Sequence, residues 1–273
     1  MILNKISQAI MLSGVVFLSA CSEQAPSSTD NTAVELAQKS SAQSGPKLIN
    51  ADKQRLDIYT DFSLQSDLLH LSDNQRAMVA KLIDASKIMD ELFWKQAFGE
   101  NKDAFLAKLN DEKVRKFADI NYGPWDRLNG DEAFLSSYKE KPLGAQFYPA
   151  DITKEELNNA DVEDKTGLYS VIKRDEQGKL YSVPYSKEYA DELAKAADIL
   201  REASKLADDK EFANYLNLRA DALQKDDFQV SDFAWMDMKN NPVDVVIGPI
   251  ETYEDQLFGY RAAYESYVLI KDL

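Results

Sequence analysis

Apolar residues recur every three or four positions in three long segments of the chain, which is the spacing that places them on one face of a helix. Ser72, followed three residues later by Gln75, has the spacing of a capping box at a helix start. Thr153 and Glu156 repeat that spacing. The patterns predict long helices near residues 73–97, 186–207 and 209–223, and shorter helices over 104–117 and after Thr153.

Runs of β-branched and aromatic residues predict strands between and after these helices. Residues 167–172 and 180–183 flank a polar stretch that contains Gly178, a pattern typical of a hairpin. The run 243–247 stops at Gly248-Pro249, and residues 264–270 form a further strand-like segment. The expected fold class is therefore α+β, mostly helical with a small antiparallel β-sheet.

The first twenty residues have the pattern of a signal peptide. Lys5 precedes an apolar run over residues 6–18 that is too short to span a bilayer. The run ends in Leu18-Ser19-Ala20-Cys21, which is similar to a lipobox, in which the cysteine is lipidated. The alternative is a buried free cysteine after an ordinary signal sequence. We expect Cys21 to anchor the protein in a lipid bilayer of the cell envelope, and Ser22 favours an outer membrane, facing the periplasm.

The rest of the chain divides into a tether and a body. Residues 21–47 are rich in Ser, Ala, Gln, Asn and Thr and have no sustained apolar period, so they predict a flexible tether. Residues 48–273 form the expected globular body, which is long enough to bury a substantial core.

The formal net charge of this 273-residue chain is −15, which argues against nucleic acid as a partner. Acidic pairs at Asp208-Asp209 and Asp226-Asp227 lack the pattern of a calcium loop and are expected to be helix caps and turns. Trp94, Trp125 and Trp235 could line a peptide groove, although a tryptophan more often packs in a core.

The most informative segment is residues 243–270. Gly248-Pro249-Ile250-Glu251 is followed by Tyr253, Asp255, Gly259, Arg261, Glu265 and Val268. This pattern resembles the dipeptidyl peptidase III family of zinc metallopeptidases. Tyr215-Leu216, Arg219-Ala220 and the segment 233–237 are similar to its shorter bacterial lipoprotein-type members. The likeness covers roughly residues 48–272.

The resemblance implies that Glu251, Tyr253 and Glu265 hold the free amino terminus of a peptide substrate. That role is chemically reasonable, because an ammonium group carries a positive charge and three hydrogen-bond donors. Without the resemblance, Glu251 could simply cap the turn after Pro249, and Glu265 could lie on a solvated strand face.

The chain departs from the family at the metal. The family's zinc is held by a His-Glu-x-x-x-His helix and a further Glu, whereas His70 is the only histidine here and Cys21 the only cysteine. We therefore expect no metal in this chain, zinc being the cofactor of the full-length family. The resemblance implies an amino-terminal portion from a truncated or split reading frame, with the missing carboxy-terminal half as a possible partner. Apolar surface around residues 264–270 should then be exposed.

Three functions follow from these observations. In the first, the chain is the amino-terminal portion of a dipeptidyl peptidase III-like zinc hydrolase, which supplies the amine site but is inactive alone. The alternative is a non-catalytic envelope lipoprotein that binds peptides or a partner chain. The third is a metal-free acid/base hydrolase that uses a carboxylate pair such as Glu251 with Asp255.

Overall fold

The computed structural model describes residues 55–99 and 101–271. The predicted signal peptide, Cys21 and the tether lie outside these residues. Helices in the described part include η2 (Leu56–Ile58), α1 (Asp73–Ala97), α2 (Lys102–Ala107), α3 (Glu112–Ile120), α4 (Lys154–Asn159), α5 (Tyr185–Glu188), α6 (Ala190–Ser204), α7 (Lys210–Lys225) and α8 (Gln229–Asp237). None of these helices is both long and apolar enough to cross a membrane.

Helix α1 begins as its capping box predicts. The Ser72 side chain accepts a hydrogen bond from the Gln75 amide, and the Gln75 side chain accepts one from the Ser72 amide. Thr153 caps α4 and Asp209 caps α7, each through one hydrogen bond that its side chain accepts from the amide three residues later, so these predicted helix starts are confirmed. Asp226 ends α7 in the left-handed conformation, and both acidic pairs thus include a helix cap.

Two predicted helices are each divided in the structure. The segment 186–207 forms α5 and α6, because Tyr189 departs from helical geometry with φ of −117°. The segment 104–117 is not one helix, as predicted, but falls into α2 and α3. Asp111 interrupts it by accepting hydrogen bonds from the amides of Lys113 and Val114 and thereby capping a new helix.

The described strands form three two-stranded antiparallel sheets. They are β1 (Trp125–Asp126) with β2 (Glu132–Ala133), β3 (Ser170–Arg174) with β4 (Leu180–Pro184), and β5 (Val243–Glu251) with β6 (Ala263–Ile270). The predicted α+β class, with mostly helix and small antiparallel sheets, is confirmed. The small β1–β2 pair was not anticipated.

Strand β5 does not stop at Gly248-Pro249, as the sequence suggested, but continues to Glu251. Gly248 has φ of 138°, a conformation that side chains disfavour. A Cβ at this position would lie 3.3 Å from the Phe228 ring. Gly248 therefore leaves room for the Phe228 ring, and Pro249 lies at a register irregularity inside the strand.

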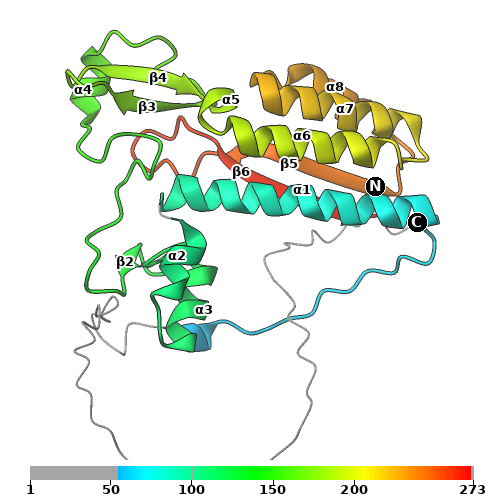
Figure 1. Cartoon of the computed structure of the whole chain (residues 1–273), viewed down its shortest axis with the longest axis horizontal. Helices are drawn as coiled ribbons and strands as arrows, with labels where there is room; N and C mark the ends of the chain where they lie inside the picture. Colours follow the sequence, from blue (N-terminus) through cyan, green and yellow to red (C-terminus); the bar gives the residue numbers. More distant parts are fainter. Residues whose placement is uncertain (1–54, 100, 272–273) are drawn as a thin grey trace, which may run out of the picture.

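Helices cover the long β5–β6 pair. Figure 1 shows α1 and α6 lying alongside it, with α7 and α8 continuing the layer of helices. The largest cluster of buried apolar side chains joins α1, α6 and α7 to this strand pair, and Leu82, Leu200 and Val245 are fully buried within it. A second, aromatic cluster around Phe105 and Phe117 holds α2 and α3 against the end of α1.

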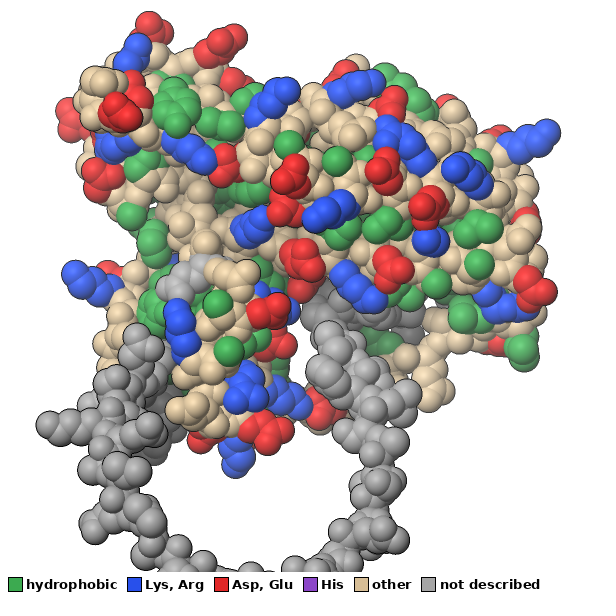
Figure 2. Space-filling view, viewed as in Figure 1, with side chains coloured by type: hydrophobic (Ala, Val, Ile, Leu, Met, Phe, Trp, Pro, Cys, Tyr) green, Lys and Arg blue, Asp and Glu red, His purple; other side chains and the backbone are tan. Residues whose placement is uncertain are grey.

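The outer surface of the helices is solvated. In the face seen in Figure 2, basic and acidic side chains alternate over α1 and α6 without a large region of one sign. Lys81 of α1 pairs with Glu202 of α6 across 2.5 Å, and Lys95 pairs with Glu192. Such exposed pairs contribute little to stability, so the helices are held mainly by the buried apolar contacts.

The exposed apolar side chains do not lie where the sequence predicted them. Tyr264 is fully buried because α1 covers its strand, and residues 265–270 are only partly accessible. The prediction of an exposed apolar surface around 264–270 is therefore wrong. Exposed large apolar side chains gather instead on α8, an element that the sequence patterns did not predict.

Candidate functional site

A bulge in β5 brings Glu251 and Glu265 to the same face of the strand pair. Gly248 lies opposite Glu265, and a register shift between Pro249 and Glu251 sets Glu251 opposite Ala263. Side chains of directly opposed residues share a face, as do residues two apart on one strand. Ala263 and Glu265 are two apart, so the extra residue at the bulge turns Glu251 toward the face that carries Glu265.

Two tyrosines hold the carboxylate of Glu265. The Tyr253 hydroxyl donates to one carboxylate oxygen at 2.8 Å, and the Tyr267 hydroxyl donates to the other at 2.7 Å. Burial is the larger cause, and the hydrogen bond to Glu265 the next, of a raised pKa in both tyrosines. The pKa of Tyr253 lies above its usual value, and the pKa of Tyr267 is raised to about 12. Both phenols are therefore neutral donors at physiological pH.

The three predicted residues thus lie in one region of the molecule. The charge of Glu251 contributes to the raised pKa of Tyr267, which places Glu251 within electrostatic reach of the Glu265 group. Within the described part of the chain, the Glu251 side chain is exposed and makes no hydrogen bond or ion pair. Its carboxylate is available to a ligand at the exposed end of β5.

Asp255 shapes the loop that carries Tyr253. Its buried carboxylate accepts hydrogen bonds from the Tyr148 hydroxyl and from the amides of Leu257, Phe258, Tyr260 and Arg261. The carboxylate is 2% exposed and fully used in these bonds. Asp255 therefore organises the loop and is not available as the acid/base partner of Glu251.

Buried charges tie both sides of this loop to the body. Glu254 accepts two hydrogen bonds from the Arg127 guanidinium, at 2.7 and 3.2 Å, and lies 2.7 Å from the Lys141 ammonium. Arg261 is fully buried and donates to the carbonyls of Lys165 and Gly167. Buried ions need an ion pair or hydrogen bonds to be stable. Glu254 is ion-paired, whereas Arg261 relies on backbone carbonyls, and its Nε has no hydrogen-bond partner among the described residues.

Sequence reasoning included Asp255 and Arg261 in the pattern of the resemblance, but it missed their burial, the burial of Glu254 and the contact of Tyr267. The contact of Tyr267 with Glu265 had a signal, because residues two apart on a predicted strand face the same side. The burial of Glu254, Asp255 and Arg261 had none, since charged residues in a polar loop are ordinarily expected to be exposed.

The described residues do not fit a zinc hydrolase centre. His70 is exposed just before α1, and the described part of the chain has no cluster of three or more His, Cys, Asp or Glu side chains that could hold a metal ion. Zinc in proteins takes mainly nitrogen and sulfur ligands. The polar atoms near Glu251 are carboxylate and phenol oxygens, which can accept hydrogen bonds from an ammonium group.

The tryptophans divide between core and surface. Trp94 and Trp125 are 1% and 6% exposed and pack in the aromatic cluster around Phe105, whereas Trp235 is 39% exposed on α8. Two surface hollows, of about 420 and 500 Å³, adjoin α8, and none of the three predicted residues lines either of them.

Comparison with known proteins identifies a family and a fold. Residues 138–273 match the model of peptidase family M49. Dipeptidyl peptidase III from Caldithrix abyssi has the same fold, with a TM-score of 0.74 and 37% identity over 80% of this chain and 43% of that one. Dipeptidyl-peptidase III from Corallococcus sp. strain EGB gives a TM-score of 0.75 and 32% identity over 83% of this chain and 44% of that one.

A curated relative extends the likeness to plants. Nudix hydrolase 3 of Arabidopsis thaliana is 32% identical over 281 residues, which cover 81% of this chain and 36% of that protein. The chain thus spans less than half the length of each of these relatives, and what their names say of activity applies to those whole proteins.

The Asp255 network generates a stability prediction. In the Asp255→Asn variant, an NH2 group replaces one of the two carboxylate oxygens. Whichever way the side chain turns, this NH2 group faces amide or hydroxyl groups that donate hydrogen bonds to the carboxylate in the wild type. We expect the free energy of unfolding to fall by about 2–4 kcal/mol in urea titrations, since each unsatisfied buried donor costs about 1–3 kcal/mol. Asp161→Asn, on an exposed residue, should change it by less than about 0.5 kcal/mol. Equal stability of the two variants would contradict the assigned role.

Proposed function

Residues 138–273 belong to peptidase family M49, and on that premise we propose that this chain binds the free amino terminus of a peptide through Glu251, Tyr253 and Glu265. The observation that carries the proposal is the bulge in β5, which turns two carboxylates to one face of the strand pair beside a tyrosine hydroxyl. Without that register shift, Glu251 would point to the opposite face.

The chemistry of the three side chains supports this function. An ammonium group offers three donors, and the site offers the Glu251 carboxylate, the remaining lone pairs of Glu265 and the Tyr253 oxygen as acceptors. The two tyrosine hydrogen bonds fix Glu265 before a ligand arrives, so less side-chain freedom is lost on binding. Hydrogen bonds between ionised partners are also stronger than neutral ones.

We propose further that the chain does not cleave peptides alone. The family's reaction needs zinc, and the donors of this chain do not fit a zinc centre: the one histidine, His70, is exposed before α1, and the one cysteine is expected to be lipidated. The amine site would therefore serve hydrolysis only together with the part of the family's length that holds the metal.

The alternative function is that of a non-catalytic envelope lipoprotein that binds peptides or a partner chain. This alternative uses the same amine site, but no metal-bearing part would cleave the bound peptide. In either case, we propose that lipidated Cys21 anchors the protein in the outer membrane, facing the periplasm.

Calorimetry at pH 7 with tetra-alanine amide tests the amine site. N-acetylation of the peptide should weaken binding at least about tenfold, because it removes the charge and two donors. Glu251→Gln and Glu265→Gln should each weaken binding of the free peptide about tenfold. Affinity should also fall as the pH rises above about 8, where the peptide's own α-amino group loses its proton.

The matched control is Glu176→Gln, which removes one exposed carboxylate from the β3–β4 turn and should leave binding unchanged. If the acetylated and free peptides bind equally well, or if the control weakens binding as much as the site variants, amine recognition at this site is ruled out.

Detergent partitioning tests the anchor at Cys21. In a two-membrane bacterium, the wild-type chain should enter the detergent phase and the outer-membrane fraction, since each buried methylene contributes about 0.8 kcal/mol. Cys21→Ser should move it to the aqueous phase, and Ser22→Asp should keep the lipidated protein in the inner membrane. A Cys21→Ser variant that still partitions with the membrane would show that the cysteine is not the anchor.

A further inference from the structure

Helix α8 displays an unusual concentration of exposed apolar side chains. Val230, Phe233 and Met236 are 57%, 57% and 60% exposed, and their spacing of three residues aligns them along one side of the helix. Ser231 is the buried residue of this nine-residue helix. Single exposed apolar residues are ordinary on a protein surface, but a contiguous group of them marks an interaction site.

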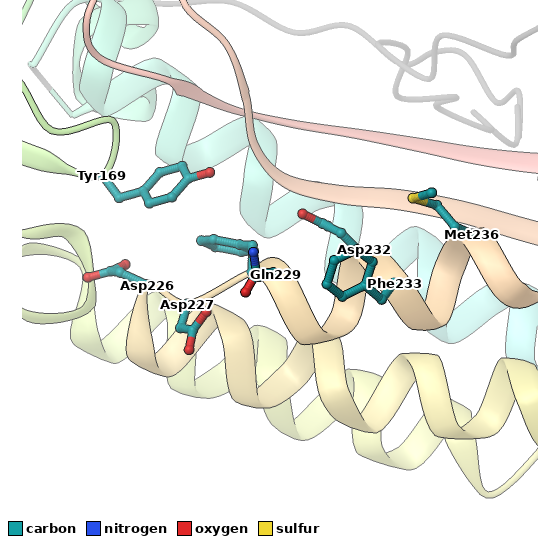
Figure 3. A pocket seen from close by; sticks show the side chains of 8 residues that line it. Tyr169, Asp226, Asp227, Gln229, Asp232, Phe233 and Met236 are labelled. Atoms are coloured by element: carbon teal, nitrogen blue, oxygen red, sulfur yellow. The ribbon is translucent and has the colours of Figure 1, made fainter.

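Two hollows flank this row of side chains. One, of about 420 Å³, extends to Tyr169 and Phe228, and the other, of about 500 Å³, extends to α7. Phe233 lines both hollows and so stands between them. Figure 3 shows Phe233 and Met236 projecting from α8, with Asp226, Asp227 and Tyr169 around the same hollow. A partner could place apolar side chains on either side of Phe233.

Carboxylates surround the apolar row. The first hollow is lined by Asp226, Asp227 and Asp232 and by no Lys or Arg, and the second by Glu211 and Asp237 with one lysine, Lys210. Asp232 is paired with Arg219 behind it. One Asp226 oxygen accepts from the Ser186 amide, and the other is buried without a partner among the described residues.

We propose that the α8 surface, meaning Val230, Phe233 and Met236 with the five carboxylates around them, binds a cationic amphipathic segment of another protein. Apolar side chains of that segment cover the row on α8, and its Lys or Arg side chains meet the surrounding carboxylates. The surface shares no residue with Glu251, Tyr253 and Glu265, so this interaction goes beyond the proposed function.

The charge of the chain selects this partner over other possible occupants. A second copy would bring the same acidic surface and a formal charge of −15 against itself, and like charges facing each other oppose association. An anionic membrane surface is disfavoured for the same reason. A cationic segment gains at both the apolar row and the carboxylates.

Trp235 provides a reporter beside the surface, where its indole N–H donates a hydrogen bond to Asp244 of β5. It lies on α8 and is 39% exposed, whereas the two other tryptophans of the chain, Trp94 and Trp125, are buried. The probe is an N-acetylated 18-residue amphipathic peptide of Leu and Lys, and its counterpart has Glu in place of each Lys. Acetylation removes the α-amino group of the probe, and the α8 variants lie outside the amine site, so failure here leaves the proposed function untouched.

We expect the Lys probe to shift Trp235 emission to shorter wavelength and to bind at least about tenfold more tightly than the Glu probe. Phe233→Ser with Met236→Gln should weaken the Lys probe about tenfold or more, and Asp227→Asn with Asp237→Asn should weaken it and reduce its salt dependence. The controls Leu128→Ser, an exposed apolar residue elsewhere, and Glu176→Gln should bind like the wild type.

Two results would overturn the proposal. Equal weakening by the control and α8 variants would mean that the probe is attracted to the acidic chain as a whole. Sedimentation showing micromolar self-association that Phe233→Ser abolishes would mean that a second copy covers α8.

Discussion

The Asp255 carboxylate determines the path of the loop between β5 and β6. Its two oxygens accept five hydrogen bonds, four of them from backbone amides two to six residues later in the chain, and this closes the loop on itself. Glu254 and Arg261 then fasten the closed loop to two separate parts of the body. Tyr253 is exposed at the start of this loop, so its contact with Glu265 depends on the buried charges that hold the loop in place.

In our proposal, amine recognition and peptide hydrolysis are separate functions. The strand pair with its bulge presents oxygen acceptors at one exposed end, which suits a cationic amine. Nitrogen and sulfur donors for a hydrolytic zinc are not assembled anywhere in the described part of the chain. A second acidic surface, on α8, combines carboxylates with exposed apolar side chains and so suits a larger cationic partner. The strong negative charge of the chain is consistent with both kinds of ligand.

Local signals predicted much of the fold. The caps at Ser72, Thr153 and Asp209 fixed helix starts because a side chain and a nearby amide suffice to form them. The course of β5 past Pro249 could not be predicted, since the bulge that tolerates the proline depends on pairing with a strand further along the chain. Helix α8 was missed because its apolar residues face solvent and leave no stripe toward a core. The site residues came from a resemblance, and their alignment on one face came only from the register.

The central claim is that this chain recognises the head of a peptide and does not hold a hydrolytic metal. Its most direct test is to incubate the purified chain with zinc, remove loosely bound metal, and measure both zinc content and release of arylamine from dipeptidyl-arylamide substrates. We predict substoichiometric zinc and no turnover above the uncatalysed rate. One tightly held zinc per chain, with turnover that a chelator abolishes, would contradict the claim.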